Sequence, residues 1–283
     1  MMSSLPTTPF TLQGPEVTRI GLGGEGILRT FGHQAEARFV IEEALSQGIT
    51  YFDTAPAYSG SQAYLGSVWS ERPQARQGIF HTSKSAERTY SGALKDLDTT
   101  LQRFGFESLD LWQIHDVRTS EDIRRIEAQD GALNAFIEAR KEGRVKHIGV
   151  TGHHDPHILL KCVQNWPLDS VLLPANPAET LVGGFLDHVL QEARQKGMVV
   201  IGMKCLGGGQ YVQPQIGLTA QKLLRYSLHI GSDLIVVGCS SPQEVQELVS
   251  AVQSGPLEDI ERAELETAFK PNAWGLAFYR GPR

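Results

Sequence analysis

Short apolar segments recur along the chain, and longer segments of helical period separate them. Eight of the short segments predict strands, at residues 17–20, 49–53, 79–82, 109–114, 145–150, 170–173, 199–203 and 234–237. Val, Ile and Leu fill them almost without polar alternation, which is typical of strands buried on both faces of a parallel sheet. The pattern therefore predicts eight parallel strands.

The segments between the strands carry apolar residues at helical spacing. Helices are predicted at residues 35–47, 90–104, 132–142 and 185–196. Gly48, Gly143 and Gly197 follow three of them, and glycine is the residue that most readily ends a helix. Another helix is predicted after Asp155-Pro156, since aspartate caps helix N-termini and proline suits the first helical position.

Eight alternations of strand and helix, without a break in composition, predict one α/β domain over residues 1–283, a single (β/α)8 TIM barrel. The length fits, because such a barrel takes about 250 residues. Phe10-Thr11-Leu12 precedes the first strand and predicts a short N-terminal hairpin that plugs the bottom of the barrel.

Composition and charge narrow the class of protein. The net charge is −6 and no block of Lys and Arg stands out, so a nucleic-acid partner is not expected. No apolar run reaches 18 residues, and the start of the chain lacks the pattern of a signal peptide, so no membrane association is expected. The three cysteines are far apart, which favours the reducing cytoplasm over a disulfide framework or a metal site.

Three predicted strands deliver titratable side chains at or just beyond their carboxyl ends, namely Asp53, Lys84 and His115, and Tyr58 follows Asp53 by five positions. These strand ends share the face of a barrel where chemistry is done. A phenol has a pKa of about 10, and a nearby ammonium lowers it, so Lys84 is expected to tune Tyr58. Asp53 is expected to hold Lys84, and His115 to orient a carbonyl oxygen. Since none of these residues can supply a hydride, a nicotinamide cofactor is expected.

The motifs FDTAPAY (52–58), TSK (82–84) and DLWQIH (110–115) resemble those of the aldo-keto reductase family. Asp53, Tyr58, Lys84 and His115 match the catalytic tetrad of that family. The similarity runs from about Ile20 to Leu248, and the segments IGMK (201–204) and LGGG (206–209) resemble one subgroup. The resemblance implies an oxidoreductase that reversibly reduces a carbonyl with NADP(H) or NAD(H), bound extended on the barrel.

The resemblance also implies a cofactor site, although this chain departs from the family there. Thr151-Gly152-His153 stands where the family has Ser-Asn, and Leu172 replaces a glutamine, with Asn176 as a possible substitute. Met203 replaces an aromatic residue that stacks on nicotinamide. The predicted cofactor-binding residues are Gly23, Thr151, Gly152, His153, Asn176, Met203, Lys204, Leu206, Gly207, Gly209, Gly238, Ser240, Ser241, Glu244 and Glu247.

The phosphate groups of the cofactor have two predicted binding segments. Lys204 and the glycines after it are expected to cradle the pyrophosphate. Ser240, Ser241 and the helix that opens at Pro242 form an anion site for the adenosine phosphate. Family members that prefer NADPH generally carry Lys and Arg in this stretch, whereas Glu244 here would repel a 2′-phosphate. The sequence therefore does not decide between NADP(H) and NAD(H).

The substrate is expected to be a small neutral carbonyl or hydroxylated compound. Asp116-Val117 follows His115 where the family often has Trp-Pro, and an acid at that place disfavours anions. The C-terminal stretch at residues 273–279 either closes over the pocket or packs on the barrel wall. The oligomeric state is not predicted.

Two other functions stay open at this stage. A metal-dependent TIM-barrel hydrolase would use Asp53, His115 and His153, but adjacent side chains in 153–155 point apart and Asp155 already caps a helix, so no metal site is predicted. A nucleotide-sensing protein of the aldo-keto reductase type would bind the cofactor and turn over slowly.

Overall fold

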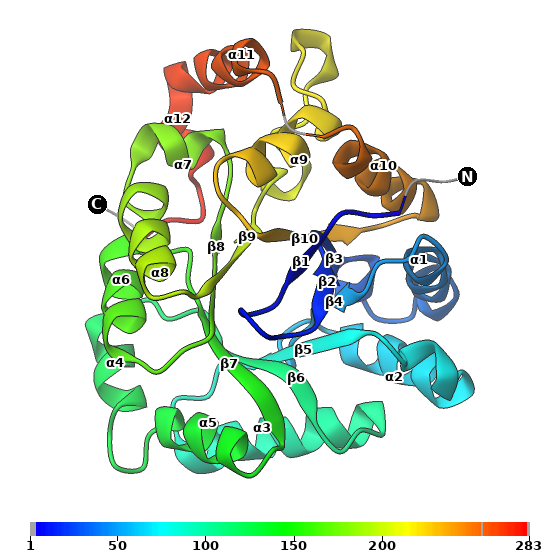
Figure 1. The fold of residues 1–283 in the computed structure, drawn as a ribbon, viewed down its shortest axis with the longest axis vertical. Coiled ribbons are helices and arrows are strands. Elements are labelled where there is room, and N and C mark those ends of the chain that lie inside the picture. The colour runs from blue at the N-terminus through cyan, green and yellow to red at the C-terminus, as the bar shows by residue number, and fades with distance from the viewer. Residues whose placement is uncertain (1–3, 256, 282–283) are drawn as a thin grey trace.

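The computed structural model describes residues 4–255 and 257–281 and shows eight parallel strands that close into a barrel (Figure 1). The strands follow one another around the barrel in chain order, and the last pairs with the first. They are β3 (Ile20–Gly26), β4 (Tyr51–Phe52), β5 (Phe80–Ser85), β6 (Leu109–Ile114), β7 (Val145–Thr151), β8 (Ser170–Pro174), β9 (Val199–Met203) and β10 (Leu234–Cys239). The predicted (β/α)8 barrel is confirmed.

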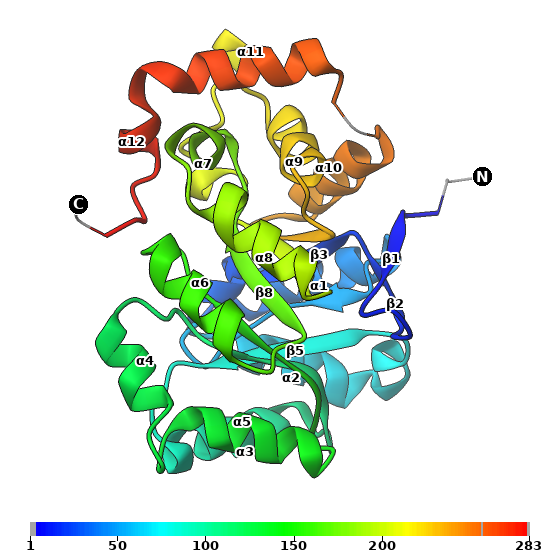
Figure 2. The ribbon, with the colours of Figure 1, turned by 60° about the vertical axis from the view of Figure 1, so that its left-hand side comes forward.

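Helices surround the barrel (Figure 1). Those around its wall bury their apolar faces against the strands, whereas the last two helices of the chain pack on other helices. They are α1 (Gln34–Ser46), α2 (Ser61–Glu71), α3 (Tyr90–Phe104), α4 (Ser120–Ile126), α5 (Ala132–Lys141), α6 (Pro156–Asn165), α7 (Pro177–Val182), α8 (Leu190–Gln195), α9 (Ala220–His229), α10 (Pro242–Gln253), α11 (Asp259–Phe269) and α12 (Ala273–Leu276). Figure 2 shows α11 lying across α7 and α9 at one edge of the molecule. In the part of the chain that the structure describes, no helix has both the length and the apolar character needed to cross a bilayer.

The first barrel strand does not lie where the sequence predicted it. Val17 belongs to β2 (Glu16–Thr18), which pairs antiparallel with β1 (Thr7–Pro9), and the barrel strand β3 begins only at Ile20. The prediction at 17–20 was wrong because β3 has the sequence IGLGGEG, in which glycines interrupt the apolar run. The chain needs a glycine at position 24, since a Cβ there would lie 2.8 Å from the Tyr58 ring.

The predicted N-terminal hairpin is confirmed, and it closes the bottom of the barrel. Phe10 lies between β1 and β2 and is fully buried. Its ring centroid is 4.4 Å from that of Phe80, the first residue of β5, and 5.1 Å from that of His147 in β7. The amino ends of the strands are therefore sealed, and ligands must enter at the carboxyl ends.

Candidate active site

A buried ion pair between Asp53 and Lys84 lies at the carboxyl ends of β4 and β5. The Lys84 Nζ donates to Asp53 Oδ2 at 2.5 Å and to the Thr54 carbonyl at 3.0 Å, and its side chain is fully buried. The other carboxylate oxygen accepts hydrogen bonds from Thr82 and Gln113. Breaking a buried pair by removing one partner costs about 3–5 kcal/mol, so this arrangement holds the lysine in one place.

Tyr58 lies over this pair and faces His115. The Lys84 Nζ is 4.8 Å from the centroid of the Tyr58 ring, and the phenol oxygen is 3.5 Å from His115 Nε2. The Arg29 guanidinium approaches the same ring at 5.3 Å. The structure thus brings together the four residues that the sequence predicted to form one site.

The charge states of this cluster differ from the expectation in one respect. Burial raises the pKa of Tyr58 well above its ordinary value of 10.0, and the negative charge of Asp53 adds to the effect. Lys84 was expected to lower that pKa, but the loss of water around the phenol and the negative charge of Asp53 outweigh the effect of the ammonium. Tyr58 is therefore a neutral phenol, which is the form that donates a proton.

His115 is also neutral. Burial lowers its pKa from 6.5 to about 3, and the positive charge of Lys84 contributes to the shift. Its Nδ1 is buried without a hydrogen-bond partner among the described residues. A neutral imidazole facing a neutral phenol can hold a carbonyl oxygen between them without a competing charge.

Arg88 fixes the backbone that carries His115, although no motif in the sequence pointed to this arginine. Its two terminal nitrogens donate to the carbonyls of His115 and Asp116, each at 2.8 Å, while its Nε donates to Asp122. Asp116 has a φ of 54°, in the left-handed region that few non-glycine residues adopt. The guanidinium therefore holds a strained turn directly behind the imidazole.

Thr151 and Asn176, two of the residues predicted to bind the nicotinamide, already have protein partners. The Thr151 hydroxyl accepts from the Asp116 amide at 2.8 Å. Asn176 is fully buried: it accepts from the Glu179 amide as the N-cap of α7 and donates to the Lys204 carbonyl and the Tyr279 hydroxyl. Asn176 thus supports the site from below instead of lining it.

The segments that follow β7 and β9 line the mouth of the barrel. His153 has Nε2 3.4 Å from an Asp116 carboxylate oxygen and Nδ1 3.3 Å from the Tyr279 carbonyl, and burial lowers its pKa. A Cβ on Gly152 would lie 3.2 Å from both a Leu159 methyl group and the Val117 carbonyl oxygen, so even a methyl side chain would be tight there. Met203, at the end of β9, is half-buried and packs on the inner core of the barrel.

The loop after Met203 exposes its backbone. Lys204 is half-buried and has a φ of 58°, and Leu206 leads into a tight turn over Gly207–Gly209 in which all three glycines have positive φ. Gly207 lies against the Tyr211 ring, whereas a Cβ on Gly208 or Gly209 would touch nothing. A ligand can therefore approach this backbone closely, as the sequence predicted for a phosphate cradle.

The predicted phosphate site after β10 is partly occupied by the chain itself. Ser241 caps α10 by accepting from the Glu244 amide at 3.2 Å, and the Glu244 carboxylate accepts from the Ser240 amide at 2.7 Å. Glu247 lies one turn further along α10 and is exposed. Gly23 and Gly238 lie side by side below this segment, because a Cβ on Gly23 would be 3.0 Å from the Gly238 nitrogen.

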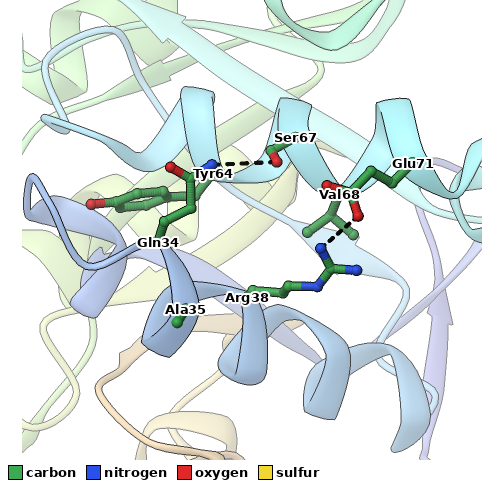
Figure 3. Close-up of a pocket in the computed structure, with 7 residues that line it drawn as sticks. All are labelled: Gln34, Ala35, Arg38, Tyr64, Ser67, Val68 and Glu71. Carbon is green, nitrogen blue, oxygen red and sulfur yellow. Dashed lines mark hydrogen bonds and ion pairs between the residues drawn. The ribbon is translucent and has the colours of Figure 1, made fainter.

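Features elsewhere on the molecule do not add to this site. Figure 3 shows a shallow pocket on the outer flank between α1 and α2, spanned by an ion pair between Arg38 and Glu71. It contains none of the predicted site residues. Among residues 4–255 and 257–281, no group of three or more His, Cys, Asp or Glu side chains could hold a metal ion.

A TIM barrel with these four residues at the carboxyl ends of its strands is the arrangement that the sequence predicted for an oxidoreductase. The sequence model of the Aldo/keto reductase family matches residues 19–216, and the chain belongs to this family. It is thus an NAD(P)H-dependent enzyme that reduces carbonyl groups, and neither the hydrolase nor the sensing alternative is favoured.

The chain is similar to several characterised reductases and dehydrogenases. It is 25% identical to pyridoxal 4-dehydrogenase of Microbacterium luteolum, over 72% of this chain and 71% of that protein. It is 25% identical to 6-dehydroglucose reductase of Novosphingobium aromaticivorans, over 76% and 74% of the two chains. The solved structure of an aldo-keto reductase from Bacillus halodurans in its holo form superposes with a TM-score of 0.77, at 18% identity, covering 93% of this chain and 96% of that one. This last likeness concerns the fold.

Proposed function

We propose that the protein reduces a small neutral carbonyl compound and that Tyr58 donates the proton. When bound, a nicotinamide would supply the hydride for the carbonyl carbon. Tyr58 gives its phenolic hydrogen to the carbonyl oxygen, so the product is an alcohol. The observation that carries this assignment is the position of Tyr58, 3.5 Å from His115 and directly over the ion pair of Lys84 and Asp53.

The four residues have separate tasks in this proposal. Tyr58 is buried as a neutral phenol and holds the proton until the oxygen develops charge. Lys84 lies next to the ring, so its ammonium stabilises the phenolate that remains after transfer. Asp53 keeps the ammonium in place, and the neutral His115 ring donates a hydrogen bond that orients the carbonyl oxygen.

The residues of the barrel mouth suit a nucleotide cofactor. Met203 offers an apolar surface on which a flat ring can pack, and the Thr151 hydroxyl keeps its own hydrogen for a carboxamide oxygen. Lys204 and the exposed backbone of Gly208 and Gly209 offer positive charge and amides for phosphate groups. These groups support a cofactor that lies across the mouth from β7 to β10.

We propose that NAD(H) is preferred to NADP(H). Glu244 places a carboxylate on the Ser240 amide, which is a donor that a phosphate would otherwise use. In the described segment from Gly238 to Glu247 there is no lysine or arginine to compensate it. A carboxylate can accept a hydrogen bond from a ribose hydroxyl, whereas it repels a 2′-phosphate.

Substitution of Glu244 tests this preference. We expect Glu244→Gln to tighten NADPH binding by about tenfold, because one repulsive charge is removed, while NADH binding weakens or stays the same. Glutamine can still accept from the Ser240 amide, so the helix cap is retained. The measurement is a fluorescence titration with both nucleotides, and Glu264→Gln on α11 is the control of equal charge change. Tighter NADPH than NADH binding by the wild-type protein would contradict the preference.

Several features support a neutral substrate and a cytoplasmic enzyme. The Asp116 carboxylate lies next to His115 and is bound by the Arg118 guanidinium. Burial raises its pKa, but the hydrogen bond from Arg118 and the neighbouring charges lower it overall, so the negative charge persists. An anionic substrate would meet this charge. Cys162, Cys205 and Cys239 are buried and unpaired, as is common in reducing compartments. The net charge of −6 supports the absence of a nucleic-acid partner.

A further inference from the structure

The C-terminal segment after α12 passes α7 and reaches the loops at the mouth of the barrel (Figures 1 and 2). Tyr279 is 92% buried there, and its hydroxyl donates to Glu179 at 2.7 Å and accepts from Asn176 at 2.8 Å. Arg280 forms an ion pair with Glu179, which is fully buried, and donates to the Gly183 carbonyl. The segment is thus anchored to α7 through a buried charge.

The same segment contacts the loop that follows β7. The Tyr279 carbonyl lies 3.3 Å from His153 Nδ1, and the two rings meet edge to face with centroids 6.0 Å apart. The Gly281 amide donates to the His154 carbonyl at 3.0 Å. Since His153 Nε2 faces Asp116, which directly follows His115, this contact ends within one residue of the catalytic cluster.

Through Asn176 the segment also reaches the loop that follows β9. Asn176 donates one amide hydrogen to Tyr279 and the other to the Lys204 carbonyl, where the backbone adopts its left-handed conformation. A single tyrosine therefore connects the loops after β7, β8 and β9. These loops form the side of the mouth on which the proposed nicotinamide surface of Met203 and Thr151 lies.

We infer that Tyr279 is a positioning residue of the nucleotide site. Its hydroxyl fixes Asn176, which fixes Lys204, and its carbonyl fixes His153, so that the wall of the site is set before the nucleotide arrives. This inference rests on the proposed function and deepens it. By thermodynamic reciprocity, a tail that favours nucleotide binding must itself be stabilised by the nucleotide.

The test removes the Tyr279 hydroxyl and compares it with a matched hydroxyl elsewhere. Tyr226 on α9 is fully buried, and its hydroxyl bonds to Thr180 of α7 and to Glu266, away from the loops of the mouth. Each substitution removes one buried hydroxyl group. The Tyr279 hydroxyl bonds to Glu179 of α7 and to its N-cap Asn176, and the Tyr226 hydroxyl bonds to Thr180 of α7. We expect Tyr279→Phe to raise the Kd and KM for the nucleotide by at least about fivefold, and Tyr226→Phe to change them by less than about twofold.

A second measurement uses the wild-type protein and needs no variant. Hydrogen exchange of the peptide that covers residues 277–281 is expected to slow several-fold when the preferred nucleotide is added. Unchanged affinity in Tyr279→Phe together with unchanged exchange would show that the tail is only structural and would overturn the inference. Tighter binding in Tyr279→Phe would also overturn it, because the tail would then obstruct the site. If the wild-type protein binds neither NADH nor NADPH, the proposed function itself fails.

Discussion

At the scale of single residues, burial decides which groups in the site carry charge. Tyr58 and His115 would titrate near 10 and 6.5 in water, yet both are neutral here because the barrel mouth has removed their solvent. Lys84 and Asp53 stay paired below them. The sequence identified all four residues, since three stand at strand ends and Tyr58 follows one of them by five positions. It could not show that desolvation outweighs the ammonium in setting the pKa of Tyr58.

Arg88 offers a test of positioning at this scale. Lysine at this position keeps the charge but cannot reach two carbonyls and a carboxylate at once, so the His115–Asp116 turn should loosen. We expect Arg88→Lys to lower kcat by about tenfold while the KM for the nucleotide changes little. Steady-state kinetics, with kcat and the nucleotide KM measured separately, test this expectation.

Arg76→Lys is the matched control for Arg88→Lys. Arg76 also donates to a backbone carbonyl, that of Gly105, but on the outer surface of the barrel. A purely structural role for Arg88 would lower stability and leave kcat of the folded protein at the wild-type level, which would contradict positioning.

At the scale of elements, the strands were easier to predict than a helix whose buried face includes polar side chains. Strand β5 is buried along its whole length, with Thr82 and Lys84 pointing to Asp53 inside the barrel and Ser83 pointing out to Gln62 of α2. Helix α2 was not predicted; its buried face begins with the polar Ser61 and Gln62 and continues with an apolar stripe, Tyr64, Leu65, Val68 and Trp69. The two polar side chains are inside because they hydrogen-bond to Thr54, Ser83 and Thr100.

His81 in β5 predicts how stability depends on pH. It packs between Trp69 and Phe106, and burial lowers its pKa from 6.5 to about 4. Below pH 6.5 the unfolded chain binds a proton that the folded one does not, so stability falls as the pH drops from about 6.5 to about 4. At pH 5 this loss is about 2 kcal/mol relative to pH 7.

The variant His81→Phe checks that assignment. The His81 Nε2 has no hydrogen-bond partner among the described residues, so phenylalanine keeps the ring packing without an orphaned polar group. Denaturant unfolding at pH 7 and at pH 5 should show an acid loss smaller than that of the wild-type protein by about 2 kcal/mol. An identical loss in both proteins would mean that other groups carry the pH dependence.

At the scale of the whole molecule, closure of the barrel explains why the sequence predicted the catalytic cluster but not the contacts of the C-terminal segment. Asp53, Lys84 and His115 were expected to meet because parallel strand ends always share a face. The sequence left open whether residues 273–279 close over the pocket or pack on the barrel wall. It did not show that Tyr279 meets Asn176, because 103 residues of chain separate them and neither residue stands in a motif. The role of Asn176 as a cap that connects loops likewise became apparent only once the tail was in place.

The central claim is that Tyr58 donates the proton in carbonyl reduction by this barrel, and turnover by Tyr58→Phe tests it most directly. The substitution removes one oxygen and keeps the ring that Lys84 and His115 contact. We predict that reduction of a neutral aldehyde slows by at least about a hundredfold, whereas the Kd for the nucleotide stays within about twofold of the wild-type value. Turnover at the wild-type rate would contradict the assignment of Tyr58 as the proton donor.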